Sequence, residues 1–217
     1  MKPTKDICVY AASSPHLAPA FYEAAYRTGQ LLARCGFGLI NGAGREGLMK
    51  ACTDGALQEG GTTTGIIPRF MLQQGWQYEA MTHIIPTPDM HTRKQLMADK
   101  SAGAIALPGG YGTLEELAEI ITWKQLGLYD KPIVILNTNN FYTPLIRWFS
   151  QAVEQQFVAP RHAHIWHTAR TPEEAVEYIL QEIGSPAAPA ETNIPTETCP
   201  HTTPESSAAD PTTHLNA

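Results

Sequence analysis

A short apolar run passes directly into a glycine-rich turn and then a polar helical pattern in Ala104-Ile105-Ala106-Leu107-Pro108-Gly109-Gly110-Tyr111-Gly112-Thr113-Leu114-Glu115-Glu116. The apolar run is continuous rather than alternating, which is typical of a parallel strand covered on both faces. A strand that leads through a tight turn into a helix is the repeating unit of an α/β sheet. Ligands bind to such sheets beyond the carboxyl ends of the strands. The stretch therefore predicts both the fold class and the place of a functional site.

The rest of the chain repeats this alternation. Strands are expected over Ile7–Ala11, Gly38–Asn41, Thr64–Ile67, Ile84–Ile85, Ala104–Leu107, Ile133–Leu136 and, with the weakest pattern, His164–Trp166. Helices are expected near residues 19–35, 47–59, 91–100, 113–126, 141–156 and 172–183. Gly36 and Gly127 stand where helix C-caps belong, and Thr171-Pro172 is suited to begin a helix. The sequence therefore predicts an α/β protein with a doubly wound parallel sheet.

The length of 217 residues suits one domain followed by a tail. Residues 1–183 are expected to form that domain, whereas residues 184–217 are rich in Pro, Thr, Ala and Ser and are predicted to be disordered. The tail contains four of the 21 acidic residues and none of the 15 basic ones, so residues 1–183 hold 17 acidic residues against 15 basic ones. A nearly neutral domain without a basic stripe argues against binding of nucleic-acid polymers.

Composition also bears on the location of the protein. Apolar residues make up 43% and charged residues 17%, which is typical of a soluble globular protein. The chain has no run of eighteen apolar residues that could span a membrane, and Met1–Val9 contains no signal-peptide core. Its four cysteines, Cys8, Cys35, Cys52 and Cys199, show no C-x-x-C spacing and are expected to be reduced thiols. A cytoplasmic location is therefore predicted.

A first glycine-rich loop, Asn41-Gly42-Ala43-Gly44-Arg45-Glu46-Gly47, contains the spacing G-x-G-x-x-G. A dinucleotide-binding fingerprint also needs an acidic residue about twenty positions further on, at the end of the next strand. That strand ends here in Ile67-Pro68-Arg69, and the loop follows the second strand rather than the first, so NAD-dependent redox chemistry is disfavoured. Two interpretations remain open: glycines that permit close packing or, preferred here, amides that face a small anion.

The second loop, Pro108–Gly112, can turn several N–H groups toward a ligand, and the helix expected to begin near Thr113 adds its N-terminal dipole. These features predict a phosphate site. A structural alternative stays open, because Thr113-x-x-Glu116 has the spacing of a capping box. The two interpretations conflict over Glu116, since a carboxylate that caps its own helix is less available to a substrate.

A basic pair lies between the two loops, in Asp89-Met90-His91-Thr92-Arg93-Lys94. It is expected to begin a helix beside the second loop. The guanidinium of Arg93 offers a planar, permanently charged fork for phosphate or carboxylate. The alternative is a solvated helix face, which adjacent basic residues often mark.

Taken together, these motifs resemble the LONELY GUY (LOG) family, long labelled as lysine decarboxylases. The paired signature of that family, P-G-G-x-G-T-x-x-E with an upstream M-H-x-R-K, is matched by Pro108–Glu116 and Met90–Lys94. Further matches are Gly47-Leu48-Met49, Gly65-Ile66-Ile67-Pro68, Ile121–Gly127 and Lys131-Pro132. The resemblance spans roughly residues 6–183.

The resemblance implies a modified Rossmann fold, a homodimer and a phosphoribohydrolase. Such an enzyme splits the N-glycosidic bond of a nucleoside 5′-monophosphate, such as a cytokinin riboside 5′-monophosphate or AMP, into free base and ribose 5-phosphate. The family's catalytic pair falls on Arg93 and Glu116. The substrate-binding residues that the resemblance implies are Glu79, Lys94, Gly109, Gly110, Tyr111, Gly112, Thr113, Leu114, Glu115 and Thr122. No metal or other cofactor is implied.

The chain departs from the family mainly at small residues. The family's C-G-S-S, Y-G-G-G and G-L-M-G are here Ala11-Ala12-Ser13-Ser14, Asn41-Gly42-Ala43-Gly44 and Gly47-Leu48-Met49-Lys50. An alanine in place of a glycine restricts loop geometry. The catalytic pair is untouched, so activity is expected while the choice of substrate is in question.

The chemistry of the residues agrees with such a cleavage. Reaction at C1′ passes through an oxocarbenium-like state, which a carboxylate can stabilise while it orients or deprotonates the attacking water. The hypothesis gives this role to Glu116, has Arg93 anchor the substrate and help the base leave, and uses the glycine loop to hold the 5′-phosphate. Glu115, one residue earlier on the helix, points about 100° away.

Other functions fit less well. Lysine decarboxylation needs a Schiff-base lysine, and only Lys94 of the seven lysines lies in a motif. In a strand, His162 and His164 would share a face, but they have no Cys or acidic partner at ligand spacing, so a metal site is not expected. A non-catalytic nucleotide or molybdenum-cofactor carrier of similar fold is the remaining alternative, yet a carrier has no need of a carboxylate at C1′. Tyr111 is the aromatic side chain expected nearest the ligand.

Overall fold

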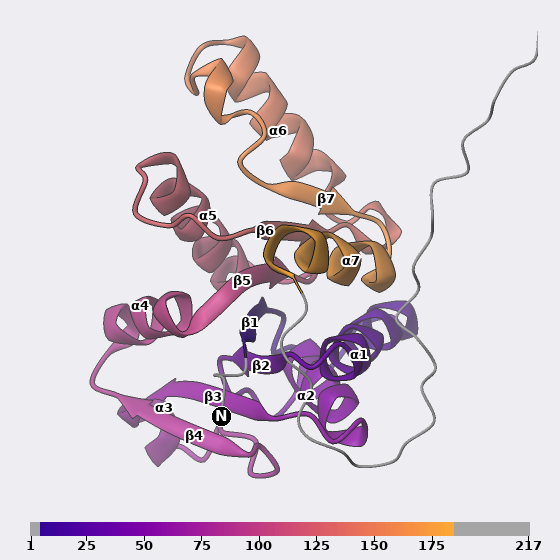
Figure 1. The fold of residues 1–217 in the computed structure, drawn as a ribbon. Helices are drawn as coiled ribbons and strands as arrows, with labels where there is room; N and C mark the ends of the chain where they lie inside the picture. The colour runs from indigo at the N-terminus through magenta and orange to yellow at the C-terminus, as the bar shows by residue number, and fades with distance from the viewer. Residues whose placement is uncertain (1–4, 185–217) are drawn as a thin grey trace, which may run out of the picture.

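A computed structural model describes residues 5–184, so the predicted tail, apart from Gly184, and Cys199 lie outside the described residues. Strands and helices alternate along this part of the chain (Figure 1). The strands are β1 (Asp6–Tyr10), β2 (Gly38–Asn41), β3 (Thr63–Pro68), β4 (His83–Thr87), β5 (Ser101–Ala106), β6 (Ile133–Leu136) and β7 (His167–Ala169). The helices are α1 (Pro19–Arg34), α2 (Gly47–Gln58), α3 (Arg69–Gln73), α4 (Met90–Lys100), α5 (Tyr111–Gln125), α6 (Thr143–Glu154) and α7 (Pro172–Ile183).

The strands form one sheet in the order β4-β3-β2-β1-β5-β6-β7, and every pairing is parallel. The chain builds outward from β1 as far as β4 and then returns to the other side of β1 with β5. This arrangement confirms the predicted doubly wound parallel sheet. The strand order reverses between β1 and β5, which is where such folds bind ligands.

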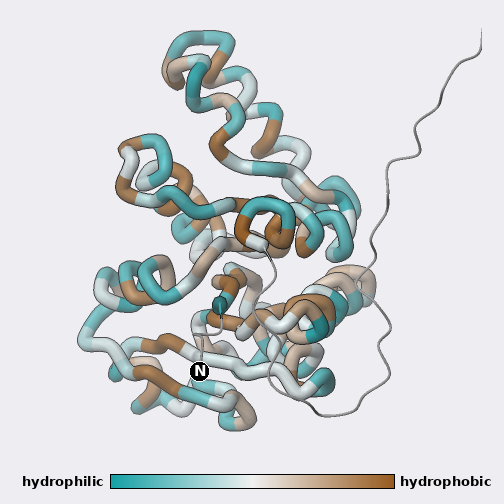
Figure 2. The backbone as a smooth tube through the Cα atoms, in the orientation of Figure 1, coloured by the Kyte–Doolittle hydropathy of each residue, from teal (hydrophilic) through white to brown (hydrophobic). Residues whose placement is uncertain are grey.

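Helices cover both faces of the sheet. Ile7 and Val9 of β1 pack in one core cluster with α1, α2 and α7, whereas Cys8 and Tyr10 point the other way into a cluster with α4, α5 and α6. Successive residues of a strand face opposite sides, so continuous apolar runs are what this arrangement requires. The hydropathy colouring in Figure 2 is brown around β1, at the centre of the sheet.

The predicted helix ends are confirmed at several caps. The Thr171 hydroxyl oxygen accepts a hydrogen bond from the N–H of Glu174 (3.2 Å), which begins α7 with Pro172 at its first turn. Gly36 and Gly127 follow α1 and α5 in the left-handed region, with φ of +78° and +75°. Glycine adopts this conformation without a steric penalty.

The last predicted strand is wrong. β7 comprises His167–Ala169, which pair with Val134–Leu136 of β6, rather than His164–Trp166. Trp166 supplied the apolar signal, but its ring packs against Phe149 of α6, with centroids 5.4 Å apart. The helix α3 was not predicted, because its five residues are too few to show a period.

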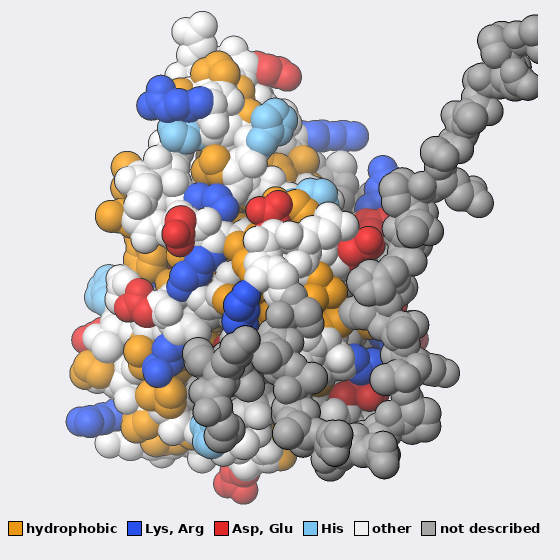
Figure 3. Space-filling view, in the orientation of Figure 1, with side chains coloured by type: hydrophobic (Ala, Val, Ile, Leu, Met, Phe, Trp, Pro, Cys, Tyr) orange, Lys and Arg blue, Asp and Glu red, His pale blue; other side chains and the backbone are white. Residues whose placement is uncertain are grey.

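Within residues 5–184, no helix is both long and apolar enough to cross a lipid bilayer. On the face shown in Figure 3, the Lys and Arg side chains are interspersed with Asp and Glu.

Candidate active site

The candidate active site lies at the carboxyl edge of the sheet, where the strand order reverses. The loops that leave β1 and β5 run together there, since the N–H of Leu107 donates to the carbonyl of Tyr10 (2.8 Å) and the N–H of Ala12 donates to that of Pro108 (3.3 Å). The second glycine loop therefore stands at the ligand-binding edge, as the sequence predicted.

Arg93 is directed inward by the start of α4. Asp89 caps this helix, because its Oδ1 accepts a hydrogen bond from the N–H of Thr92 (2.7 Å). Only 7% of Arg93 is exposed, and its Nε donates to the carbonyl of Ile66 in β3 (3.1 Å). Gly42 makes room for the guanidinium, since a Cβ at Gly42 would lie 1.8 Å from Nη2 of Arg93. The helix cap, strand β3 and the loop that follows β2 thus fix the position of this cation.

The first glycine loop packs against Arg93, and hydrogen bonds donated by its backbone hold the loop in place. The N–H of Ala43 donates to Oδ1 of Asn41 (2.9 Å), and the N–H of Arg45 donates to the carbonyl of Trp76 (3.2 Å). These two N–H groups donate to acceptors within the protein, so neither faces a ligand. The preferred interpretation, in which the amides of this loop face an anion, is wrong at both positions. The close contact between Gly42 and Arg93 agrees with the packing interpretation.

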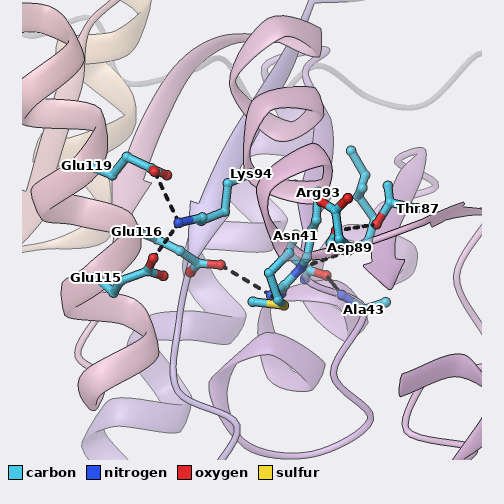
Figure 4. A network of polar contacts seen from close by, with 11 residues as sticks. Asn41, Ala43, Thr87, Asp89, Arg93, Lys94, Glu115, Glu116 and Glu119 are labelled. Atoms are coloured by element: carbon cyan, nitrogen blue, oxygen red, sulfur yellow. Dashed lines mark hydrogen bonds and ion pairs between the residues drawn. The ribbon is translucent and has the colours of Figure 1, made fainter. Parts of the chain in front are cut away.

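Glu116 faces Arg93 from α5 (Figure 4), and Nη1 of Arg93 lies 3.6 Å from Oε1 of Glu116. The Glu116 side chain is 11% exposed. Burial raises the pKa of Glu116 to about 7, although the charge of Arg93 opposes the rise. A carboxyl group with a pKa near neutrality can take up or release a proton at physiological pH.

The capping-box interpretation of Thr113 and Glu116 is wrong. The helix α5 begins at Tyr111, two residues earlier than predicted, so Thr113 lies inside its first turn and is buried. A Cβ at Gly109 would lie 2.0 Å from Oγ1 of Thr113, so the hydroxyl group packs beneath the loop. Glu116 is consequently available to Arg93.

At two further positions of the loop, packing would allow a side chain larger than glycine. A Cβ at Gly110 or at Gly112 would meet nothing within 4 Å, and neither residue has a positive φ. The missing side chains leave the backbone N–H groups at the start of α5 accessible to a ligand.

Lys94 extends to the other side of α4 and joins two acidic side chains of α5 (Figure 4). Its Nζ forms an ion pair with Glu115 and a second one with Glu119, at 3.1 Å. Lys94 is buried, so the basic pair is not a solvated helix face. Glu119 belongs to no motif and was missed by sequence reasoning; its place one turn after Glu115 was the only available signal.

The environment of Lys94 does not suit a Schiff-base lysine. Burial lowers its pKa, but the hydrogen bonds with Glu115 and Glu119 outweigh this effect, and the pKa is raised. A lysine that attacks a carbonyl group needs a lowered pKa, so that the neutral amine is present.

The other predicted substrate-binding residues lie at the surface. Tyr111, the first residue of α5, is 94% exposed, and Leu114 is exposed nearly one turn further on. Thr122 is exposed, and its hydroxyl group donates to the carbonyl of Ala118 (2.8 Å). Glu79 is exposed in the turn that precedes β4. These side chains are exposed to solvent, whereas the side chains of Arg93 and Glu116 are only 9% and 11% exposed.

The predicted histidine arrangement is also corrected. His162 lies in a 3-10 turn, Pro160–His162, so it does not share a strand face with His164. Across the described part of the chain, no three His, Cys, Asp or Glu side chains are grouped so as to hold a metal ion.

Comparison with known proteins identifies the family. The family described as "Possible lysine decarboxylase" matches residues 49–179. The cytokinin riboside 5′-monophosphate phosphoribohydrolase LOG5 of Arabidopsis thaliana is 39% identical over 173 residues, which cover 80% of this chain and 76% of that protein. LOG3 of the same plant, which has the same description, is 37% identical over 195 residues, or 90% and 88% of the two chains. The chain belongs to the LOG family.

Among solved structures, the Moco carrier protein of Chlamydomonas reinhardtii is similar to this LOG-family chain, with a TM-score of 0.66 and 24% identity. The likeness covers 83% of this chain and 98% of that one. At this level of identity, it concerns the fold alone.

One departure from the LOG signature has a visible structural effect. Ala43, which replaces a glycine of the family, is buried and has a φ of +63°, a conformation that favours glycine. Its carbonyl accepts a hydrogen bond from the N–H of Tyr78 (2.8 Å), and its N–H is held by Asn41. The loop therefore keeps a glycine-like shape because its neighbours hold the alanine on both sides.

Proposed function

We propose that the protein is a phosphoribohydrolase that cleaves the N-glycosidic bond of nucleoside 5′-monophosphates. The observation that carries this proposal is the buried Glu116 carboxyl group, with a pKa of about 7, facing Arg93 beside an open glycine loop. The names of the LOG relatives support the same reaction. Cytokinin riboside 5′-monophosphates and AMP are the proposed substrates.

Glu116 and Arg93 have different roles in the reaction. The Glu116 carboxylate accepts a proton from water while the water oxygen bonds to C1′ and the C1′–N bond breaks. The electron pair of that bond leaves with the base, which takes up a proton. The Glu116 charge also stabilises the oxocarbenium-like transition state, and Arg93 anchors the nucleotide and helps the base leave.

The glycine loop supplies the remote binding energy. The backbone N–H groups of Tyr111, Gly112 and Thr113, in the first turn of α5, hold the 5′-phosphate, assisted by the helix dipole. Binding the phosphate at a fixed point positions C1′ over the Glu116 carboxylate. Tyr111, Leu114, Thr122 and Glu79 contact the rest of the nucleotide from the rim. Lys94 acts beside the site through Glu115.

The first test is release of free base from AMP, GMP, CMP, UMP and isopentenyl-AMP by the purified protein. Glu116→Gln is expected to lower the rate at least about 100-fold, because the carboxylate that stabilises the developing charge is lost. Glu115→Gln is the matched control, since Glu115 is the neighbouring acid but points toward Lys94. Nucleotide binding without base release by the wild-type protein would instead indicate a non-catalytic carrier.

We further propose that the protein acts as a homodimer in the cytoplasm. The buried free thiols of Cys8 and Cys52 are compatible with a reducing compartment. Self-association would cover large apolar side chains that are exposed at the end of α5, Leu126 and Leu128.

A further inference from the structure

The hydroxyl group of Tyr142 reaches the root of the second glycine loop. Tyr142 is 4% exposed, and its Oη donates a hydrogen bond to the carbonyl of Leu107 (2.8 Å), the last residue before the loop. Burial raises the pKa of Tyr142, and a hydrogen bond from the backbone of Gly109 opposes the rise. One phenol group therefore contacts the loop on both sides of Pro108.

The segment that carries Tyr142 is built to hold it in place. The N–H of Tyr142 donates to Oδ1 of Asn137 (2.7 Å), and Nδ2 of Asn137 donates to the hydroxyl of Thr143 (3.1 Å). Asn139 and Asn140 turn the chain through the left-handed region, with φ of 51° and 60°. Asparagine tolerates this conformation better than most residues. The turn after β6 thus fixes the tyrosine from its backbone side.

The loop is consequently attached to both neighbouring strands. On the β1 side, the N–H of Ala12 donates to the carbonyl of Pro108 (3.3 Å). On the β6 side, the Tyr142 hydroxyl holds the carbonyl of Leu107. Tyr142 lies outside the two signature motifs and more than twenty residues beyond the second one, so neither motif assigns it a role.

We propose that Tyr142 is a positioning residue, which fixes the exit of β5 so that the N–H groups at the start of α5 point toward the 5′-phosphate. This inference rests on the proposed function for the reaction, but the effect on phosphate binding does not require turnover. A loop that is fixed before the ligand arrives loses less conformational freedom on binding.

The test is the variant Tyr142→Phe, which removes only the hydroxyl group. The KM for AMP is expected to rise about five-fold, the typical effect of one hydrogen bond, while kcat changes less than two-fold. Calorimetric titration with inorganic phosphate and with ribose 5-phosphate is expected to show the same loss of affinity. Binding of free adenine is expected to remain unchanged, because adenine lacks the phosphate.

Tyr129→Phe is the matched control. Tyr129 is another buried tyrosine of the same core cluster, but it precedes β6 and therefore lies at the opposite edge of the sheet. Equal effects of both substitutions on phosphate affinity, or no effect of Tyr142→Phe, would overturn the proposal. If Tyr142→Phe does not fold, Asn137→Ala, which loosens the backbone of Tyr142 but keeps its hydroxyl, is expected to weaken phosphate binding in the same direction.

The two proposals fail in different ways. If the wild-type protein releases no base but binds ribose 5-phosphate, and Tyr142→Phe weakens that binding, the hydrolase is wrong and the positioning role stands. If the wild-type protein turns over AMP and Tyr142→Phe matches it in KM and in phosphate affinity, the positioning role is wrong. Absence of phosphate binding by the wild-type protein would also overturn it.

Discussion

Glu116 is subject to two opposing influences on its ionisation. Burial favours the neutral acid, and Arg93, 3.6 Å away, favours the carboxylate. Glu115 and Glu119 raise the pKa of Glu116 further, and Lys94 lowers it. Burial raises the pKa of Cys8 and Tyr10 on β1, and the charge of Glu116 adds to the rise in both. The balance places the pKa of Glu116 at about 7, so both forms are populated at neutral pH.

This balance predicts the pH dependence of activity. The carboxylate is the form that accepts a proton from water, so kcat/KM is expected to fall as the pH drops below about 7. A pH–rate profile measures this limb. Because the substrate phosphate titrates near pH 6, the Glu116 carboxyl group should also be titrated by NMR in the ligand-free protein, with Glu116→Gln identifying its signal. An acid limb near pH 4.5 would contradict the raised pKa that burial gives Glu116.

Among the helices, α4 and α5 are joined by the Lys94 ion pairs beside Arg93 and Glu116, the proposed catalytic pair. Lys94→Met is expected to raise the pKa of Glu116 and move the acid limb to higher pH, because a nearby positive charge is removed. Glu119→Gln is expected to move the limb to lower pH, because a nearby negative charge is removed. The two pH–rate profiles should therefore shift in opposite directions. Shifts in the same direction would indicate a general loosening of the helices.

The glycines of the second loop differ in how much space surrounds their Cα atoms. Gly112→Ala is expected to raise the free energy of unfolding by about 0.5 kcal/mol, because alanine favours the helix. It should nevertheless weaken AMP binding, since the new methyl group projects into open space at the loop. Gly109→Ala is expected to lower both stability and binding, because its Cβ would clash with Thr113. Thermal unfolding and calorimetry separate these outcomes; unchanged AMP affinity in Gly112→Ala would refute close approach of the ligand there.

The success of sequence reasoning also varied by element. Ile133–Leu136 was predicted with its exact bounds, because a short, wholly buried strand shows a continuous apolar run. The start of α5 was misplaced, because Thr113 has the residue type of an N-cap although Gly110 occupies that position. The ion pair with Glu119 and the contact from Tyr142 depend on tertiary packing between distant elements, which no local pattern encodes. The site roles of Arg93 and Glu116 remain predictions, although the fold brings the two side chains together.

For the molecule as a whole, a dimer is the expected state. Sedimentation equilibrium should give about twice the chain mass of 23.7 kDa. Leu128→Asp is expected to shift the protein toward the monomer, because it places a charge on an exposed apolar surface at the end of α5. Phe70→Asp, on α3, is the control and should leave the mass unchanged. A wild-type monomer at all concentrations would refute the dimer.

The facing pair at the site joins two parts of the chain that are made at different times. Arg93 is attached to β3 through the carbonyl of Ile66, whereas Glu116 is carried by α5, which follows β5. On the ribosome, the half of the sheet formed by β1 to β4 emerges while the half formed by β5 to β7 is still being synthesised. The two halves meet only when β5 pairs with β1, and such non-local pairing is a slow step in folding. A nascent or truncated chain that stops short of this step has no carboxyl–guanidinium centre, so the proposed hydrolysis requires both halves of the sheet to be in place.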